Sequence, residues 1–381
     1  MKSKLSSIIR SLRLRTLPLS LAGSMLGLFL AASEASFSWG VALLTLLTTA
    51  LLQCLSNMSN ELGDWLSGLD RDGRKGPAYS LQSGTLTEPT MRRCIVALVV
   101  ACCVAGAAMT WLSFGTLWAL EPILILMLGA AAIWAAMHYT LGKHPYGYHG
   151  LGDVFVFIFF GLVPVIGARY VAIHTLLPFT IVLPGVTMGC FSIGVLNVNN
   201  IRDMKTDAAT RTTVALKLGL KRARVYQTLL VALGWALMAA YSLFAASGLI
   251  QWMYLITIPL YVLHLRGVWT REERSLDPML PMLVMTTFVT AILFATGAFA
   301  FQAPSDGTAP LETEREESLQ TGDLIFVGLP DYTFPEDTIL IHTAMVEVDT
   351  IRTWIVDATI KRGVDRYPID PFFRNFQRRD G

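Results

Sequence analysis

Charged residues are scarce in this sequence. Asp, Glu, Lys and Arg make up 15% of its 381 residues, whereas soluble domains carry roughly a quarter. Acidic and basic residues nearly cancel, and the net charge of +2 is uninformative in total, since the distribution of the charges is what matters. We expect no nucleic-acid partner. Hydrophobic residues, by contrast, make up 53% of the chain. This balance excludes an ordinary soluble protein and predicts an integral membrane protein.

Cysteine is also scarce, and its spacing fits neither a metal site nor a disulfide framework. All five cysteines lie in or beside apolar runs, at Cys54, Cys94, Cys102, Cys103 and Cys190. A buried free cysteine behaves as a small hydrophobic side chain. We therefore expect these residues to be structural.

The sequence does contain a series of long apolar segments. About nine of them approach the 17–25 residues that cross a bilayer as a helix. They lie at about 16–32, 38–56, 94–112, 117–138, 153–171, 176–196, 225–246, 250–265 and 280–301. The second is expected to continue as helix into the polar stretch 57–70. The sequence thus predicts an all-α membrane protein with about nine transmembrane helices.

Lys and Arg are confined to alternate connections between these segments. One set of connections is basic, and the other has almost no Lys or Arg, with Arg169 as the exception. Basic connections face the cytoplasm in membrane proteins. We therefore predict a multi-pass protein of the cell inner membrane. An odd number of spans would place the C-terminal tail on the outer, periplasmic side.

Two polar clusters stand at the cytoplasmic ends of spans. Their members are Asn57, Asn60 and Asp64 in the first, and Asn200, Asp203 and Asp207 in the second. Within each cluster the residues are three, four or seven apart, so they share one face of a helix. Such residues are costly in a membrane and are usually functional.

The chemistry of the clusters leaves two interpretations open. Mg²⁺ prefers oxygen ligands and usually binds a few carboxylates together with substrate phosphates. The clusters could therefore form one Mg²⁺–diphosphate site at the membrane surface. They could instead be helix caps and solvated loop charges. Two matched clusters favour the first interpretation.

Other polar residues near the clusters are candidates for substrate contact. Cations beside carboxylates suit a metal-bridged diphosphate, because they can bind its remaining oxygens. The cationic candidates are Arg71, Arg74, Lys75, Lys205 and Arg211. A Gly- and Tyr-rich connection at 138–154 adds Tyr139, Lys143, Tyr146 and Asp153. Membrane topology and an interfacial aromatic belt are the alternative explanations for these residues.

The clusters resemble the paired aspartate-rich motifs of the UbiA superfamily of intramembrane prenyltransferases. The first reads N-x-x-N-E-x-G-D-x-x-x-G-x-D at 57–70, and the second reads N-N-x-R-D-x-x-x-D at 199–207. Supporting matches are RTLPLS at 15–20, PYGYHGLGD at 145–153 and TVALKLG at 213–219. The form resembles the branch that acts on 1,4-dihydroxy-2-naphthoate in menaquinone synthesis. Glu61 departs from the pattern, since the family usually has Asp there.

The resemblance implies a helical domain around a central cavity that opens to the cytoplasm and to lipid. It implies transfer of a polyprenyl group from a polyprenyl diphosphate to 1,4-dihydroxy-2-naphthoate, with loss of CO₂ and pyrophosphate, giving a demethylmenaquinone. The residues implied for catalysis and for binding the Mg²⁺ cofactor are Asn60, Asp64, Asp203 and Asp207. Those expected to contact the substrates are Arg15, Asn57, Asp70, Arg71, Arg74, Lys75, Tyr139, Lys143, Tyr146, Asp153, Asn200, Lys205 and Arg211.

Two alternative functions stay open. Another aromatic acceptor, such as 4-hydroxybenzoate, would require the same diphosphate chemistry. A cation-coupled transporter would also place carboxylates in a membrane, but its expected signature is inverted repeats with broken helices. The clusters lie at span ends rather than mid-span, which argues against a permeation path.

The composition changes after the last apolar segment. Residues 1–302 are predicted to form the membrane domain, and 303–320 are polar and rich in turn residues, as in a linker. Residues 321–381 contain strand-like runs at 323–328, 338–348 and 352–359 and predict a small α+β soluble fragment. They resemble the start of a circularly permuted papain-like amidase or peptidase domain, with His342 and Asp357 as its histidine and acidic partner. No cysteine follows Cys190, so we expect an incomplete domain without activity.

Overall fold

The computed structural model describes residues 4–32, 36–68, 80–208, 210–245 and 249–302, and three strands at 338–348, 351–362 and 365–368. The chain forms two units, Met1–Pro304 and Ser305–Gly381. The first unit is helical, and the described part of the second is a β-sheet.

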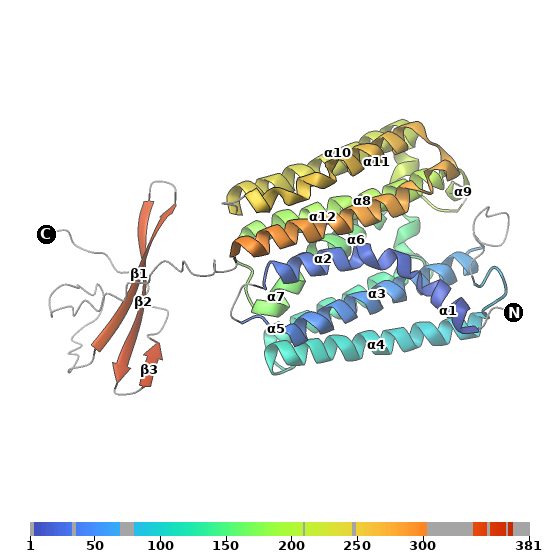
Figure 1. Cartoon of the computed structure of the whole chain (residues 1–381). Coiled ribbons are helices and arrows are strands. Elements are labelled where there is room, and N and C mark those ends of the chain that lie inside the picture. Colours follow the sequence, from blue (N-terminus) through green and yellow to red (C-terminus); the bar gives the residue numbers. More distant parts are fainter. Residues whose placement is uncertain are drawn as a thin grey trace. The chain divides into compact units, whose positions relative to one another are not determined.

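The first unit is a bundle of long helices that lie beside one another (Figure 1). Its helices are α1 (Lys4–Leu12), α2 (Leu17–Phe29), α3 (Trp39–Leu66), α4 (Glu88–Phe114), α5 (Leu120–His138), α6 (Gly152–Val156), α7 (Ala168–Ile173), α8 (Val182–Arg202), α9 (Met204–Asp207), α10 (Val214–Ala245), α11 (Ile258–Thr270) and α12 (Met279–Gln302). Short 3-10 or π-helical segments extend or join them: η1 (Leu14–Thr16), η2 (Tyr146–Tyr148), η3 (Phe157–Gly167), η4 (Phe179–Ile181), η5 (Leu249–Thr257) and η6 (Glu273–Leu276).

The helical membrane fold predicted from the sequence is confirmed. Within the described residues, eight helical stretches are long and apolar enough to span a membrane. As expected, α3 continues past its apolar part and ends only at Leu66. The segment expected at 16–32 is shorter than predicted, because α2 has 13 residues, or about 20 Å of a hydrocarbon core about 30 Å thick. Pro18 in its first turn and the left-handed backbone of Arg13 (φ 48°) separate α2 from α1.

Small residues allow the central helices to pack closely. A Cβ atom on Gly161 of η3 would lie 2.5 Å from the Cα atom of Gly189 in α8, so the two backbones are in direct contact. Small residues at helix crossings are typical of membrane bundles, where close van der Waals packing drives association. Pro164 lies inside η3, where the π-helical turn accommodates its missing N–H group. Leu26, Met188 and Phe294 complete a core between α2, α8 and α12.

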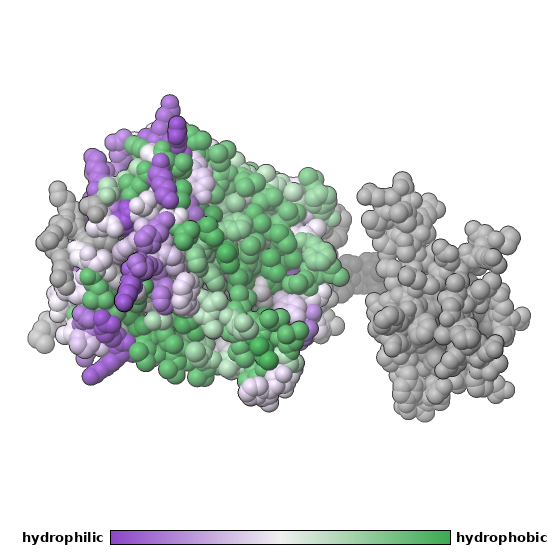
Figure 2. Space-filling view, turned by 180° about the vertical axis from the view of Figure 1, so that it is seen from behind, coloured by the Kyte–Doolittle hydropathy of each residue, from purple (hydrophilic) through white to green (hydrophobic). Residues whose placement is uncertain are grey.

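The outer surface of the helical unit is apolar over much of its area. Figure 2 shows hydrophobic residues across the middle of one face and hydrophilic residues gathered mostly at one end. Large exposed apolar side chains include Trp39, Leu243 and Ile256. Exposed apolar surface of this extent needs an apolar solvent, so the unit is a multi-pass membrane domain.

The second unit contains a three-stranded antiparallel sheet in the order β1-β2-β3. Its strands are β1 (Thr338–Val348), β2 (Ile351–Arg362) and β3 (Asp365–Pro368). Two of the predicted strand-like runs correspond to β1 and β2, and their pairing sets His342 opposite Asp357. The third run, at 323–328, lies outside the described residues. No helix occurs among the residues of this unit that the structure describes.

Candidate active site

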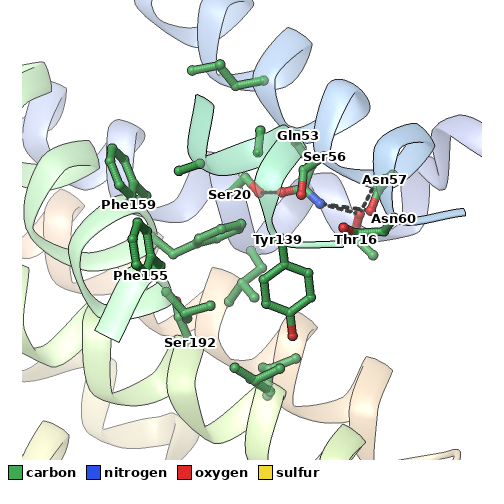
Figure 3. A pocket seen from close by; sticks show the side chains of 18 of the residues that line it. Thr16, Ser20, Gln53, Ser56, Asn57, Asn60, Tyr139, Phe155, Phe159 and Ser192 are labelled. Carbon is green, nitrogen blue, oxygen red and sulfur yellow. Dashed lines mark hydrogen bonds between the residues drawn. The ribbon is translucent and has the colours of Figure 1, made fainter. Parts of the chain in front are cut away.

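A cavity of about 1180 Å³ lies within the helical unit. Helices α2, α3, α5 and α8, segment η3 and the connection from α11 to α12 all contribute to its lining. Apolar side chains of α5 and η3, such as Leu128 and Phe159, line one part of it. In Figure 3, Phe155 and Phe159 lie on one side, and polar side chains of α2 and α3 on the other. The cavity therefore presents an apolar wall and a polar wall to a ligand.

The two acidic clusters, which are far apart in the sequence, line this one cavity. Asn60 and Asp64 come from the last turns of α3, Asp203 follows α8, and Asp207 ends α9. Helices α3 and α8 both end on the side of the bundle where α9 lies (Figure 1). Backbone topology thus brings together the residues that the sequence pattern singled out.

Asn57 holds the start of the chain against α3. Its amide Nδ2 donates to the carbonyl of Leu12 at 2.8 Å and to the hydroxyl of Thr16 at 2.9 Å. Gln53, one turn earlier, donates to Thr16 at 2.9 Å and to Asn57 Oδ1 at 3.2 Å (Figure 3). These bonds fix η1, and with it Arg15, at the edge of the cavity. In this structure Asn57 therefore positions the lining.

Asn60 and Asp64 are oriented by the connection after α5. The hydroxyl of Thr140 donates to Asn60 Oδ1 at 3.2 Å. The phenol of Tyr148 donates to Asp64 Oδ1 at 3.1 Å. Both donors belong to the Gly- and Tyr-rich connection, so this segment orients the first cluster.

Asp207 and Arg211 form a nearly buried ion pair. Arg211 Nη2 lies 2.7 Å from Asp207 Oδ2, and the two side chains are 12% and 4% exposed. Burial raises the pKa of Asp207, and the neighbouring Arg211 acts in the opposite direction. Burial disfavours the charge of Arg211, but Asp207 and then Asp64 outweigh it and raise the pKa of the guanidinium. Asp64, Asp207 and Arg211 thus interact as one charged group.

Asp203 is bound by its neighbour Arg202. The guanidinium donates to Asp203 Oδ1 at 2.8 Å and to Oδ2 at 2.5 Å. Lys205, in the next helix, pairs with Glu273 of η6. The second cluster is therefore linked to the connection between α11 and α12, which also lines the cavity.

Tyr139 lies at the centre of the site. Its ring lies between the two walls in Figure 3, and it makes an edge contact with Tyr146, their centroids 5.5 Å apart. Burial raises the pKa of the Tyr139 phenol to about 12, while Arg211 lowers it. Both tyrosines line the cavity and stay protonated at neutral pH.

The donor set suits a hard divalent cation that shares its coordination with a substrate. Asp64 and Asp207 supply carboxylate oxygens, and Asn60 supplies an amide oxygen, at the ends of α3 and α9. Over the described ranges, no three His, Cys, Asp or Glu side chains form a ready metal cluster. Mg²⁺ commonly binds through one or two carboxylates plus phosphate oxygens and water, so the residues fit it in that mode.

Several predicted residues lie outside this arrangement. Lys143 is exposed, and Asn200 is buried within α8, and neither lines the cavity. Asp153 is also outside the lining and accepts a hydrogen bond from Tyr226 at 2.9 Å. Asp70, Arg71, Arg74 and Lys75 lie outside the described residues. The remaining predicted contacts, Arg15, Asn57, Tyr139, Tyr146, Lys205 and Arg211, all line the cavity.

Glu61, the departure from the family pattern, does not line the cavity. It is fully buried, and its Oε1 accepts the backbone N–H of Leu81 at 3.1 Å. It therefore anchors the segment before α4 to the side of α3 that faces away from the site.

Three contributors to the site were missed by sequence reasoning. Tyr148 and Arg202 each donate to a member of the two clusters, and Asp277 accepts a hydrogen bond from Arg202. Tyr148 and Arg202 stand inside the quoted motifs, so their position was a usable signal. Asp277 stands 75 residues after Arg202, and only the fold brings the two together.

Comparisons with known proteins agree on one family. The model described as the UbiA prenyltransferase family matches residues 20–289. A protein of Escherichia coli (strain K12), "1,4-dihydroxy-2-naphthoate octaprenyltransferase", is 37% identical over 302 residues, which cover 79% of this chain and 97% of that protein. A protein of the same name from Haemophilus influenzae is 35% identical over 291 residues, covering 75% and 93%.

Solved structures share the fold. A UbiA homologue from Archaeoglobus fulgidus bound to DMAPP and Mg²⁺ aligns with a TM-score of 0.57 at 17% identity, covering 78% of this chain and 99% of that one. A homologue from Aeropyrum pernix aligns with a TM-score of 0.55 at 18% identity, covering 78% and 98%. These similarities establish the architecture of the helical unit.

Proposed function

The chain belongs to the UbiA prenyltransferase family, and we propose that it transfers a polyprenyl group from a polyprenyl diphosphate to 1,4-dihydroxy-2-naphthoate in menaquinone synthesis. The observation that carries this proposal is the convergence of two acidic clusters on one cavity with an apolar wall. An ionic head and a long apolar chain are the two parts of an isoprenoid diphosphate. The relatives named for the naphthoate match this chain over nearly their whole length.

Mg²⁺ is the cofactor that we propose for the polar end. Asn60, Asp64, Asp203 and Asp207 would hold it together with the diphosphate oxygens. When bound, it would stabilise the negative charge that develops on the leaving pyrophosphate. The Archaeoglobus fulgidus homologue, which binds Mg²⁺ and DMAPP, supports this assignment.

The residues of this chain would bind the head group and protect the reacting carbon. Arg15, Lys205 and Arg211 lie around the lining and can neutralise diphosphate oxygens that no metal occupies. Tyr139, Phe155 and Phe159 offer aromatic faces to an allylic cation. The apolar wall would exclude the water that would otherwise trap this cation.

The proposed reaction balances as an electrophilic substitution. The allylic C–O bond breaks, and its electron pair leaves with pyrophosphate. A carbon of the electron-rich naphthalene ring forms the new C–C bond and loses its proton. The ring carboxylate leaves as CO₂, and its electron pair takes up a proton, giving a demethylmenaquinone in its reduced, quinol form.

The location of the two units is also a proposal. We propose that the basic connections face the cytoplasm, so that the carboxylate end of the cavity lies on that side of the inner membrane. If the shorter α2 also crosses, the number of crossings is nine, and the tail is then periplasmic. We assign prenyl transfer to residues 1–302, a linker to 303–320, and no part in the transfer to residues 321–381, which resemble part of a papain-like domain.

An acceptor assay tests the function directly. Membranes containing the protein would receive labelled polyprenyl diphosphate, Mg²⁺ and either 1,4-dihydroxy-2-naphthoate or 4-hydroxybenzoate. We expect a labelled lipid product only with the naphthoate, and one CO₂ released per transfer. Faster product formation with 4-hydroxybenzoate would refute the acceptor while leaving the prenyl donor intact. Membranes with Asp64→Ala protein are the matched control.

A further inference from the structure

Arg202 occupies an unusual position between the metal ligands proposed above and the rest of the protein. It is the last residue of α8 and lines the cavity. Its guanidinium donates a hydrogen bond to each oxygen of Asp203, at 2.8 Å to Oδ1 and 2.5 Å to Oδ2. The same group donates to Asn199 Oδ1 at 2.8 Å and to Asp277 Oδ1 at 3.1 Å.

The bonds from Arg202 oppose metal binding by Asp203 as long as no substrate is present. A carboxylate offers about four lone-pair positions, and Arg202 takes one on each oxygen of Asp203. A cation that binds Asp203 therefore meets the positive charge of the guanidinium and has fewer lone pairs to use. Asp207 differs, because its contact with Arg211 engages Oδ2. A planar guanidinium binds phosphate with the same two-point geometry that it uses for a carboxylate. The diphosphate is therefore a replacement partner of the right shape and charge.

We propose that Arg202 is a substrate-binding residue that exchanges Asp203 for the pyrophosphate group when the metal–diphosphate complex enters. This proposal rests on the proposed function. Without substrate, Arg202 neutralises Asp203. When the diphosphate arrives, Arg202 turns to its oxygens, and Asp203 becomes available to the metal. Asp277 binds the outer side of the guanidinium and competes with both partners for its N–H groups.

The exchange predicts effects of opposite sign on two ligands. Removing the guanidinium frees Asp203, so a divalent cation alone should bind more tightly, by up to about fivefold for a partly exposed ion pair. Pyrophosphate should bind more weakly, by about 10- to 100-fold, because charge-assisted hydrogen bonds are lost. A residue that only stabilised the fold would weaken both ligands.

The chain offers a matched control in Arg224. This residue belongs to α10 and also holds the connection after α11, since Nη2 donates to the carbonyl of Arg271 at 2.7 Å and lies 3.8 Å from Glu272. It does not line the cavity. Arg224→Gln therefore removes a similar bond between a helix and this connection without removing a cation from the cavity.

The Asp277→Asn variant distinguishes an Arg202 that binds the diphosphate from an Arg202 that only ties α8 to Asp277. Its side chain is 54% exposed, so Asp277→Asn should fold normally. If Arg202 acts on the diphosphate, Asp277→Asn should leave pyrophosphate affinity unchanged or higher, because the guanidinium loses only a competing partner. If Arg202 acts by tying α8 to Asp277, Asp277→Asn should weaken pyrophosphate binding as Arg202→Gln does.

The test uses the full chain purified in detergent. Free Mn²⁺ would be measured by paramagnetic resonance, and inorganic pyrophosphate with Mg²⁺ by titration calorimetry, for wild type, Arg202→Gln, Arg202→Lys, Asp277→Asn and Arg224→Gln. We expect tighter Mn²⁺ and weaker pyrophosphate binding in Arg202→Gln, partial recovery of pyrophosphate binding in Arg202→Lys, and wild-type behaviour in Arg224→Gln. Equal or weaker Mn²⁺ binding in Arg202→Gln, or weakened pyrophosphate binding in Asp277→Asn, would overturn the exchange. Neither readout uses the naphthoate, so a wrong acceptor in the proposed function would leave the outcome unchanged.

Discussion

Substitutions in the ion pair between Asp207 and Arg211 can distinguish effects on protein stability from effects on prenyl transfer. Both side chains are almost buried, and the N–O distance is 2.7 Å. We consider Asp207→Ala, Arg211→Met and the double variant. All three should lose prenyl transfer, because each removes a proposed ligand of the metal or the diphosphate. Their free energies of unfolding should differ.

The magnitudes follow from what each single variant leaves behind. Removing one partner of a buried pair costs about 3–5 kcal/mol, because the other charge is left uncompensated. In Asp207→Ala, Asp64 still faces Arg211, so we expect the lower end, about 3 kcal/mol. Arg211→Met should cost less, since a carboxyl can take up a proton and the pKa of Asp207 is already raised by burial. The double variant should be more stable than the sum of the single changes predicts, by about 1 kcal/mol or more.

Unfolding can be followed with a thiol-reactive dye in the absence of divalent metal. Cys54, Cys102 and Cys190 are buried and free, so they react when the bundle opens. Without Arg211, the folded-state pKa of Asp207 rises further above its unfolded value. Arg211→Met should therefore be most stable at acidic pH and lose stability as pH rises through that folded pKa. The ion-pair account would be refuted if the two single substitutions had additive effects on the free energy of unfolding. It would also be refuted if the stability of Arg211→Met increased with pH.

Four further outcomes are expected. Asp64→Ala should nearly abolish turnover without unfolding the protein, and excess EDTA should do the same to wild type; full activity in EDTA would exclude Mg²⁺. Tyr148→Phe should lower kcat/KM about tenfold, the value of one hydrogen bond to a charged group; an unchanged value would show that Asp64 needs no orientation. A water-soluble thiol reagent should label Lys205→Cys from the cytoplasmic side and Trp118→Cys from the other; labelling of both from one side would contradict the topology. Deleting residues 310–381 should leave prenyl transfer intact, and loss of kcat in an inserted deletion variant would place the tail in the catalytic unit.

Much of the fold was predictable because lipid imposes simple rules. Membrane-length apolar runs can only be helices, and polar connections mark their ends. The continuation of α3 to Leu66 followed from the helical spacing of Asn57, Asn60 and Asp64. The shortness of α2 did not follow from hydropathy, because it depends on backbone breaks at Arg13 and Pro18 rather than on apolar content. The π-helical turn around Pro164 likewise does not follow from hydropathy, because it depends on the missing N–H group of a single proline.

The site was predictable in part for a different reason. Spacing on a helix identified two clusters of polar residues that share a face, and the family resemblance narrowed them to the four proposed metal ligands. All four line one cavity. Spacing says nothing about partners on other helices. The bond from Tyr148 to Asp64 and the link from Arg202 to Asp277 depend on tertiary contacts. Lys143 shows the opposite error, since a cation close to a motif in sequence is exposed to solvent in the fold.

Glu61 shows how helix geometry decides between two adjacent polar residues. Neighbouring positions on a helix point about 100° apart, and the positions of α3 that line the cavity near this end, Ser56, Asn57, Asn60 and Asp64, leave Glu61 outside. Asn60 does face it, and Glu61 instead reaches Leu81 on the far side of α3. A longer side chain than Asp suits this role, because it spans the extra distance to a backbone N–H outside its own helix. Glu61, where the sequence departs from the family pattern, therefore anchors a neighbouring segment in this fold and is not among the oxygen donors of the cavity.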